Sequence, residues 1–385
     1  MKTLRIVGGQ VLARAPTGID SVQETDLLLA DGRIAAIGEP GAGEATLDAA
    51  GLLVLPGIVD IHGDAFERQI QPRPGVDFPF DIALRDTEAQ LLANGITTAF
   101  HGVTLSWEPG LRSLDTWRAL LSALAAGRWV CDMRVHLRWE AFNLDALEVA
   151  IADIAAGRVH LLAFNDHTPP IVRKIKDPVT GAKYSDRAGM TLDAFRELTA
   201  HVYGRADAVP DALARIGAAA RAAGLPMASH DDDAIAVRDS FRARGARICE
   251  FPMSEAVGQA ARDAGDAVVM GSPNVVRGGS HLGWASAARL AEAGICSVLS
   301  SDYFYPAMLR AALILAGRGV LDLPRAWALI SANPAAAARL EDRGAIAPGL
   351  RADVVLVDPQ AVRVVATIAG GQVAHLTAEG MARLA

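Results

Sequence analysis

The chain has 385 residues, of which 51% are hydrophobic and 21% are charged. This balance is typical of a globular protein with a large buried core, and it excludes a disordered or fibrous chain. The formal net charge of −7 argues against a general nucleic-acid binder, because phosphate backbones are bound mainly by clustered lysine and arginine side chains.

The cysteines and the apolar runs indicate the cellular compartment of the protein. Cys131, Cys249 and Cys296 are odd in number and show no CxxC spacing, so we expect neither a disulfide framework nor a zinc knuckle. The first residues reach Gly8 before an apolar run attains signal-peptide length, and no uncharged apolar run of about 18 residues follows. The sequence therefore predicts a cytoplasmic protein that neither enters a membrane nor binds nucleic acid.

Both ends of the chain are expected to form short β-strands. The predicted strands are residues 4–7, 26–29 and 33–37 near the N-terminus, and 352–357 and 362–368 near the C-terminus. Asp31-Gly32 is a hairpin signal between two of them. We predict that the two ends pair into one small β-sandwich domain, built from residues 1–56 and 345–385.

Apolar runs alternate with alanine-rich helical stretches between these ends. Such alternation is typical of repeated βα units around a parallel sheet. Eight candidate strands occur, at residues 58–61, 97–103, 133–139, 160–164, 226–229, 247–251, 267–270 and 296–299. The sequence therefore predicts an α/β fold with a TIM-like (β/α)8 barrel over residues 57–344.

One polar segment, residues 169–210, interrupts the alternation. Long segments of this kind in compact domains are usually lids or binding elements. We expect an extended loop after the fourth strand, at the face of the barrel that carries the chemistry.

Side chains able to bind metals follow five of the predicted strands. They are His62, Asp64, Glu140, His167, His230 and Asp302. Barrel chemistry is built at the carboxyl ends of strands, and imidazole and carboxylate groups suit one or two divalent ions such as zinc, manganese or iron. The sequence therefore predicts a metal site at the mouth of the barrel.

Three of these residues also have a simpler interpretation. His62 and Asp64 lie two residues apart, so both project from one side of an extended chain, although His62 could merely cap a strand. Glu140 could bridge two ions or pair with Arg138. His167 could occupy a turn before the following prolines.

Neighbouring polar residues are expected to have structural roles. In the acidic run after His230, Asp232 or Asp233 is expected to cap the next helix. His136 shares a strand face with Arg138 but lies deeper in the barrel, which favours a packed, hydrogen-bonded core histidine.

Asp302 follows the eighth strand, which lies beside the first strand in a closed barrel. It is thereby placed next to His62 and Asp64. Asp302 is the candidate to accept a proton from water, because a metal ion can lower the pKa of bound water to about 7.

A glycine-rich stretch after the seventh strand is a candidate anion site. Its expected donors are Arg277, Gly278, Gly279, Ser280 and His281, although a plain glycine-rich turn would give the same pattern. Further cations are expected around the substrate, namely Arg73, Arg138, Lys174 and Lys176. Together they favour a phosphorylated small molecule, and in particular a polyphosphate.

With these residues assembled, the chain resembles the amidohydrolase superfamily over its whole length. The resemblance rests on a stretch that ends in Asp60-Ile61-His62, on Asn333-Pro334-Ala335, and on Gly349 to Val355. Within the superfamily it is most similar to the α-D-ribose 1-methylphosphonate 5-triphosphate diphosphatases of phosphonate catabolism. The matching stretches include His62-Gly63-Asp64, His136-Leu137-Arg138, Ser229-His230-Asp231-Asp232, Glu250-Phe251-Pro252, Asn274 to His281 and Ser301-Asp302-Tyr303.

This resemblance implies a two-metal site that hydrolyses a phosphoanhydride, releasing pyrophosphate and a ribosyl 5-phosphate. The first motif is HxD instead of the more common HxH, and no lysine ends the fourth strand, so we expect Glu140 to replace a bridging lysine. Glu250 falls on the sixth strand, where many relatives place a histidine ligand. Either the strand count is off by one or the ligand set is unusual.

Two other functions remain open. Hydrolysis of a cyclic amide or deamination of a base would use the same metals but would not need the surrounding cations. A barrel without catalysis could serve as a metal-binding assembly subunit. The sequence also leaves open whether the protein forms a homodimer.

Overall fold

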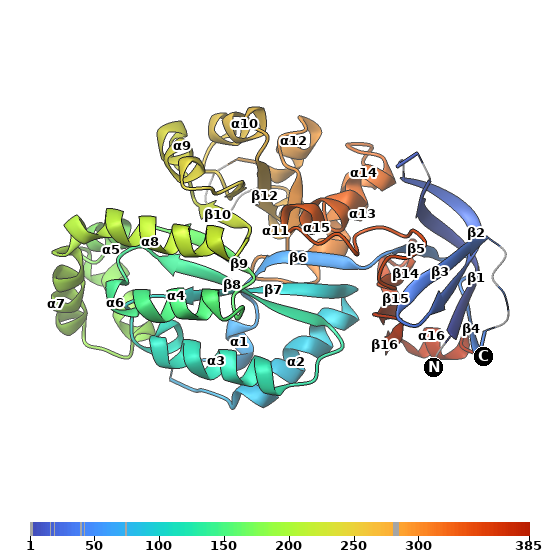
Figure 1. The fold of residues 1–385 in the computed structure, drawn as a ribbon, viewed down its shortest axis with the longest axis horizontal. Coiled ribbons are helices and arrows are strands. Elements are labelled where there is room, and N and C mark those ends of the chain that lie inside the picture. Colours follow the sequence, from blue (N-terminus) through green and yellow to red (C-terminus); the bar gives the residue numbers. More distant parts are fainter. Residues whose placement is uncertain are drawn as a thin grey trace.

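The computed structural model describes residues 3–15, 17–18, 20–38, 41, 43–73, 75–279 and 285–385. It contains two large sheets, one antiparallel for the most part and one parallel. Figure 1 shows the β unit formed by both chain ends at one end of the long axis. A group of helices, α5 to α7, lies at the opposite end, with the parallel strands between them.

The parallel sheet forms the predicted barrel. Its strands are β6 (Ile58–Gly63), β7 (Ile96–Leu105), β8 (Asp132–Glu140), β9 (Leu161–Asn165), β10 (Met227–His230), β11 (Ile248–Glu250), β12 (Ala267–Gly271) and β13 (Val298–Ser300). They are hydrogen-bonded in chain order from β6 to β13. Each predicted strand coincides with one observed strand, so the barrel and the strand count are confirmed.

The first and last strands meet at the carboxyl end of the barrel. Gly63 and Asp302 form a parallel bridge. The Asp302 N–H donates to the His62 carbonyl at 3.0 Å, and the Asp64 N–H donates to the Asp302 carbonyl at 2.9 Å. At the amino end, the carbonyls of residues 329–330 accept hydrogen bonds from both strands instead. Among the described residues, hydrogen bonds therefore join the first and last strands directly at the carboxyl end, where the predicted site residues lie.

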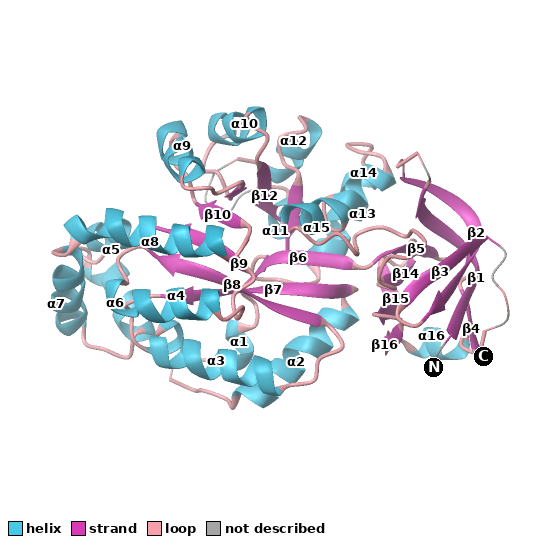
Figure 2. Ribbon diagram, in the orientation of Figure 1, coloured by secondary structure: helices cyan, strands magenta, loops and turns pink. Residues whose placement is uncertain are grey.

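Helices alternate with the strands along the chain and pack against them (Figure 2). The longer ones are α2 (Phe80–Ala93), α3 (Leu114–Ala126), α4 (Leu147–Ala155), α8 (Val209–Ala222), α9 (Ile235–Ala243), α10 (Glu255–Asp263) and α13 (Ala307–Gly317). Shorter ones are α1 (Glu67–Ile70), η1 (Gly110–Arg112), η2 (Leu144–Ala146), η3 (Ala206–Ala208), α11 (Ser272–Arg277), α12 (Ala287–Glu292), α14 (Leu323–Ala328) and α15 (Ala332–Ala337). Among the described residues, no helix is both long and apolar enough to cross a membrane.

Strand β8 illustrates how alternation positions the site. Val135, Leu137 and Trp139 are buried in the layer between the strands and the helices, together with residues of α3 and α4. His136 and Arg138 occupy the intervening positions, so they project to the other face of the sheet. The interior below them is filled by a separate apolar cluster of residues that includes Val59, Ile61, Phe100, Ala163, Ile248 and Ala335.

The two chain ends pair into one β unit, as predicted, and its strands belong to one hydrogen-bonded sheet. Its strands are β1 (Thr3–Arg14), β2 (Asp20–Ala30), β3 (Arg33–Gly38), β4 (Ala45–Asp48), β5 (Leu53–Pro56), β14 (Val354–Asp358), β15 (Arg363–Ala369) and β16 (Gln372–Leu376), followed by α16 (Ala378–Ala382). Antiparallel pairing of β5 with β14 joins the N-terminal strands to the C-terminal strands. β1 and β2 are much longer than predicted, because they form an antiparallel ribbon that continues past a bulge between Ile6 and Gly9.

The segment after β9 differs from its prediction. It is helical and not an extended loop, with α5 (Thr168–Lys174), α6 (Pro178–Arg187) and α7 (Leu192–Tyr203). Asp177 and Thr191 accept N-terminal capping hydrogen bonds for α6 and α7. Ile171, Ile175 and Phe195 form a small buried cluster of their own. Capping and local packing therefore stabilise helices in a stretch whose polar composition resembles a loop.

Candidate metal centre and substrate pockets

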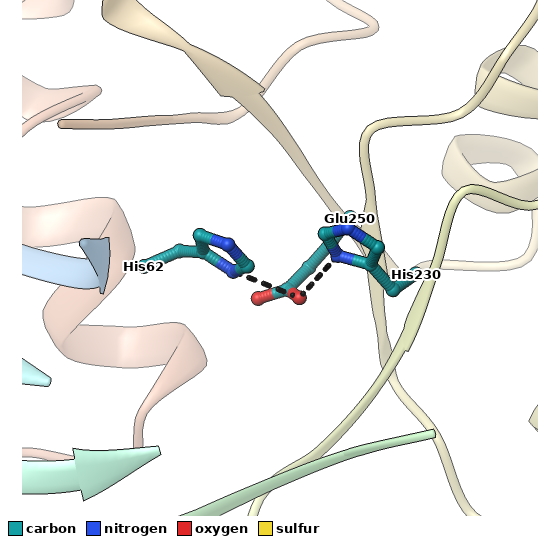
Figure 3. A group of neighbouring side chains, drawn as sticks. All are labelled: His62, His230 and Glu250. Carbon is teal, nitrogen blue, oxygen red and sulfur yellow. Dashed lines mark hydrogen bonds and ion pairs between the residues drawn. The ribbon is translucent and has the colours of Figure 1, made fainter. Parts of the chain in front are cut away.

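Three side chains from three strands converge at the carboxyl end of the barrel. His62 lies at the end of β6, His230 ends β10 and Glu250 ends β11. Figure 3 shows both imidazoles close to one carboxylate oxygen of Glu250. Glu250 Oε2 lies 3.0 Å from His62 Nδ1 and 3.3 Å from His230 Nδ1. One ligand atom of each lies within 4.8 Å of the others, so the three side chains could hold one metal ion.

A third imidazole faces the same carboxylate. His136 is fully buried, its Nδ1 lies 3.0 Å from the Ile61 carbonyl oxygen, and its Nε2 lies 3.9 Å from Glu250 Oε2. The expected packed, hydrogen-bonded core histidine is confirmed. It is also a direct neighbour of the metal-ligand candidates.

Burial controls protonation in this cluster. It lowers the pKa of His62 and His230 well below the usual value, and it lowers the pKa of His136 to about 3. The neutral imidazole is the form that binds metals, because its free lone pair is available. Burial also raises the pKa of Glu250 to about 7. A divalent cation beside this carboxylate would act in the opposite direction, since a positive charge favours the ionised form.

Several buried polar atoms of the cluster lack a hydrogen-bond partner, although His62 Nδ1 contacts Glu250 Oε2 at 3.0 Å. Within the described ranges, His62 Nδ1, His136 Nε2 and Glu250 Oε1 form no hydrogen bond. Buried polar atoms are normally paired, because leaving one unpaired is unfavourable. Imidazole nitrogens and a carboxylate oxygen are common donors for zinc and manganese. The residues present therefore fit a divalent metal ion.

A second group of candidate ligands shares His230. One ligand atom each from His167, His230 and Asp231 lies within 4.8 Å of the others, and His167 Nε2 is 3.8 Å from Asp231 Oδ2. Burial lowers the pKa of His167, but hydrogen bonds with Asp231 and Glu140 outweigh this effect and raise the pKa to about 9. The two adjacent groups offer positions for two ions.

Glu140, at the end of β8, holds the segment that carries His167. Its carboxylate accepts hydrogen bonds from the His167 N–H at 3.2 Å, and from the N–H and hydroxyl of Thr168 at 3.2 and 2.8 Å. Its Oε2 also lies 3.4 Å from His167 Nδ1. Glu140 belongs to neither group of candidate ligands. Bridging by Glu140 stays a prediction, while the observed contacts give it an orienting role.

Asp302 and Asp64 face the same cavity as His62. Burial, assisted by the charge of Asp64, raises the pKa of Asp302 to about 7. Burial and the charge of Glu67 raise the pKa of Asp64 to about 6. Gly271 leaves space for Asp302, because a Cβ at that position would lie 3.1 Å from Asp302 Oδ2. A carboxylate whose pKa lies near neutrality is suited to accept and return a proton.

Asp60 holds the two sides of the barrel seam together. It is fully buried and accepts hydrogen bonds from the Ser301 N–H at 3.1 Å and the Ser301 hydroxyl at 2.5 Å. It also accepts one from the His62 N–H at 3.2 Å. These contacts position the backbone next to both His62 and Asp302.

Arg138 lies at the centre of the barrel mouth. Its Nη1 lies 3.4 Å from Asp64 Oδ2 and its Nη2 lies 3.1 Å from His230 Nε2. Although both residues are described, no ion pair joins Arg138 to Glu140, which was the alternative interpretation of that carboxylate. Arg138 therefore supplies a buried positive charge between Asp64 and the candidate metal ligand His230.

Three residues around the site have left-handed backbone conformations. Asp231, Phe251 and Asp302 have φ angles of 58°, 52° and 55°, and they directly or almost directly follow β10, β11 and β13. Such angles are uncommon outside glycine and are seen most often where the surrounding structure enforces them. The chain thus turns sharply at the ends of the strands that carry the site.

An ion-pair network supports the end of β10 from behind. Arg238 is 1% exposed, with Nη1 3.5 Å from Asp232 Oδ2 and Nη2 3.1 Å from Asp266 Oδ2. Asp232 also accepts a hydrogen bond from the Ser229 hydroxyl at 2.5 Å. The prediction that Asp232 or Asp233 caps the next helix is wrong, because α9 begins without a side-chain cap. The Asp232 carboxylate is engaged by Ser229 and Arg238 instead.

Two cavities adjoin the candidate ligands, and Arg138, His230 and Asp231 line both. The first, which we call the Phe251 pocket, has a volume of about 180 Å³ and includes Phe251, Met270, Pro273, Arg277, Asp302 and Tyr303 in its wall. The second, which we call the Lys174 pocket, has a volume of about 220 Å³ and includes Glu108, Arg112, Glu140, Lys174, Tyr184 and Arg187.

The predicted glycine-rich anion site is only partly supported. Arg277 and Gly279 line the Phe251 pocket. However, the N–H groups of Gly278 and Gly279 already donate to the carbonyls of Val275 and Asn274, so they close α11 and are not free for an anion. Gly278 has the left-handed conformation usual after a helix. The other two predicted donors, Ser280 and His281, lie outside the described residues.

The remaining predicted cations are distributed unevenly. Lys174, the last residue of α5, lines the Lys174 pocket. Lys176 and Arg73 are exposed and line neither pocket. Lys174 and Lys176 differ in position because α5 ends at Lys174. Lys176 lies in the connection between α5 and α6.

Sequence reasoning missed several residues of the candidate metal centre and of the pockets beside it. Glu250 was noticed at a strand end but left out of the ligand set, because a histidine was expected there. Asp231 follows His230 directly, and its position at a strand end was the available signal. Arg112 and Arg187 come from η1 and the end of α6, and nothing in the local sequence connects them to the barrel mouth.

Comparison with known sequences identifies the relatives of this chain. The Amidohydrolase family model matches residues 184–380. An alpha-D-ribose 1-methylphosphonate 5-triphosphate diphosphatase from Escherichia coli (strain K12) is 32% identical over 333 residues, which cover 80% of this chain and 84% of that protein. A D-hydantoinase from Geobacillus stearothermophilus is 30% identical over 137 residues, which cover 33% of this chain and 26% of that protein.

Solved structures share the fold. A molinate hydrolase has a TM-score of 0.62 and 16% identity, covering 97% of this chain and 94% of that chain. A 5-methylcytosine deaminase from Klebsiella pneumoniae has a TM-score of 0.61 and 17% identity, covering 97% of each chain. At this level of identity the likeness shows the architecture, a barrel joined to a sheet from both termini.

Proposed function

Because the chain belongs to the amidohydrolase family, we propose that it is a metal-dependent hydrolase that cleaves a phosphoanhydride of a ribosyl 5-triphosphate. The proposed substrate is α-D-ribose 1-methylphosphonate 5-triphosphate, and the products are the 5-phosphate and pyrophosphate. The similarity to the E. coli diphosphatase supports this substrate. The observation that carries the proposal is a pair of pockets, one of them rich in cations, that adjoin the same cluster of histidines and carboxylates.

We propose that His62, His230 and Glu250 hold one divalent ion and that His167, His230 and Asp231 hold a second. Zinc, manganese and iron all suit these donors. When bound, such an ion would supply Lewis acidity to the phosphoryl oxygens and make water more acidic.

The chain's own residues account for the proton and for the charge. Asp302, whose pKa is raised to about 7, accepts the proton of the attacking water. The new bond forms between the water oxygen and phosphorus, and the bond to the bridging oxygen of the anhydride breaks. Arg138 is placed to stabilise negative charge on the phosphoryl oxygens, since its guanidinium lies between Asp64 and the candidate metal ligand His230. Asp64 is proposed to orient Arg138 rather than to act on the substrate.

Product analysis tests the proposal. Purified protein supplied with zinc or manganese should release pyrophosphate and ribosyl 5-phosphate from the ribosyl triphosphate, as detected by mass spectrometry. The same preparation should leave hydantoins and aminopurines unchanged. Turnover of either of these without release of pyrophosphate would move the assignment to carbon–nitrogen bond hydrolysis. A protein that binds no divalent metal and turns over none of these compounds would be an assembly subunit.

A further inference from the structure

The Lys174 pocket collects positive charge from four separate elements. Arg112 comes from η1, Arg138 from β8, Lys174 from the end of α5 and Arg187 from the end of α6. Arginine forms forked hydrogen bonds to phosphate oxygens, and lysine adds a mobile charge. The helical segment after β9 therefore contributes two of the four cations, although no sequence motif joins it to η1.

The carboxylates in the same wall already have partners. Glu108 accepts a hydrogen bond from Arg187. Glu140 is engaged by the N–H of His167 and by Thr168. Asp231 faces the imidazoles of the second group of candidate ligands. These carboxylates therefore compete little for a further cation.

Lys174 has no such partner. Among the residues that the structure describes, no carboxylate forms an ion pair with its ammonium group, and the side chain is exposed at the edge of the pocket. An unpaired lysine at a pocket rim remains available for an anionic ligand, whereas Arg187 is shared with Glu108.

The Phe251 pocket has a different wall. Phe251, Met270 and Pro273 give it apolar surface, and Arg277 lies within hydrogen-bonding distance of the Tyr303 hydroxyl, at 3.4 Å. This combination suits a sugar ring with one small anionic group better than a chain of phosphates, because apolar surface does not compensate for the loss of phosphate hydration.

We propose that the substrate spans both pockets, with one part in each pocket and the reacting group at the residues that line both. The terminal diphosphate lies in the Lys174 pocket, the sugar and its phosphonate lie in the Phe251 pocket, and the reacting phosphorus lies at Arg138, His230 and Asp231. This inference rests on the proposed function and adds an orientation to it.

The position of the proton acceptor agrees with this orientation. Asp302 lines the Phe251 pocket and does not line the Lys174 pocket. Attacking and leaving oxygens lie roughly in line on opposite sides of a phosphorus centre that undergoes displacement. A diphosphate that leaves into the Lys174 pocket would therefore depart on the side away from Asp302.

Binding of inorganic pyrophosphate to the metal-loaded enzyme tests the assignment without turnover. Calorimetry should show that Lys174→Met weakens pyrophosphate binding by about tenfold or more, the usual cost of losing a charged hydrogen bond. Lys183→Met is the matched control, because Lys183 is an exposed lysine of α6 that lines neither pocket. Its pyrophosphate affinity should equal that of the unmodified enzyme.

Two further variants give the reverse test. Arg112→Gln should also weaken pyrophosphate binding, whereas Arg277→Met should leave that affinity unchanged and raise the KM for the complete substrate. Loss of pyrophosphate binding in Arg277→Met alone, or the absence of binding in the unmodified enzyme, would overturn the orientation. If pyrophosphate binds as expected but is never released from a ribosyl triphosphate, the proposed function fails while the diphosphate pocket remains.

Discussion

The two halves of the barrel mouth are built differently. On the side of β6, β10, β11 and β13, the chain turns sharply after the last three of these strands, and buried side chains contact one another directly, as Glu250 does with His62 and His230. On the side of β7 to β9, the wall is completed by elements outside the sheet, namely η1 and the helices α5 and α6.

This difference separates two tasks. The strand ends fix the positions of the candidate ligands, because their backbone is hydrogen-bonded to the neighbouring strands. At Asp60 and Asp302, further contacts join the first strand to the last. The added helices present long cationic side chains that can adapt to a ligand. A change on the strand side should therefore affect chemistry or metal binding, and a change on the helical side should affect affinity for one part of the substrate.

Substitution of the proposed proton acceptor should have the largest effect. Asp302→Asn keeps the size of the side chain but cannot accept the proton, so the rate of pyrophosphate release should fall by about 10³- to 10⁴-fold. Asp233→Asn, at an exposed aspartate after β10, should retain the full rate. Initial rates measured together with metal content would separate loss of chemistry from loss of metal. A decrease of less than tenfold would remove Asp302 from this role.

The contribution of the Arg238 ion pairs to the structure around β10 can be tested by measuring stability. Arg238→Met leaves the buried carboxylate of Asp232 without its arginine partner and removes one of the arginines that contact Asp266, so it should lower the free energy of unfolding by about 3–5 kcal/mol. Arg244→Met, at the exposed end of the same helix, should change it by less than about 1 kcal/mol. Urea unfolding of both variants measures the difference. Equal midpoints would show that the network does not support β10.

Metal affinity should depend on Glu250, which was not among the ligands predicted from the sequence. Glu250→Gln removes the charged oxygen that both His62 and His230 face, so metal affinity should fall by about 10- to 100-fold or more. Glu255→Gln changes an exposed glutamate of α10 and should have no effect. Competition with a coloured chelator gives both affinities. An unchanged affinity in Glu250→Gln would place the ion elsewhere.

The smallest expected effect comes from a single methyl group. Gly271→Ala would place Cβ 3.1 Å from Asp302 Oδ2 and 3.5 Å from its Cβ, so the carboxylate must shift by a few tenths of an ångström. We expect kcat to fall by up to about tenfold with little change in KM. Gly317→Ala, where a Cβ would meet no atom within 4 Å, is the control. A normal kcat in Gly271→Ala would mean that the position of Asp302 tolerates this shift.

The barrel was predictable because its strands are short apolar runs bounded by turn and helix signals. The run at residues 247–251, which contains Glu250, was found in this way, and its pairing with β10 and β12 shows that the strand count was right. The unusual sixth-strand residue is therefore a property of this chain. The sequence could not indicate that Glu250 would face three imidazoles, because that contact joins four strands.

The helical segment and the cationic pocket were harder to predict. Proline, lysine and glycine between residues 169 and 190 resemble a loop, whereas capping by Asp177 and Thr191 and the burial of Phe195 stabilise the helices. Arg112 and Arg187 line the same pocket through tertiary packing alone. Conversely, Gly278 and Gly279 match an anion-binding pattern, but their N–H groups are engaged by the end of α11.

The direct closure of the seam at Gly63 and Asp302 has a consequence for folding. Ser301 and Asp60, which form part of this closure, are 241 residues apart in sequence. Contacts between such distant segments are slow to form, because ordering the intervening chain has a large entropic cost. We therefore expect the first and last strands to come together only after most of the barrel has formed. Recovery of enzymatic activity during refolding would then report barrel closure, and it would lag behind the recovery of helical structure.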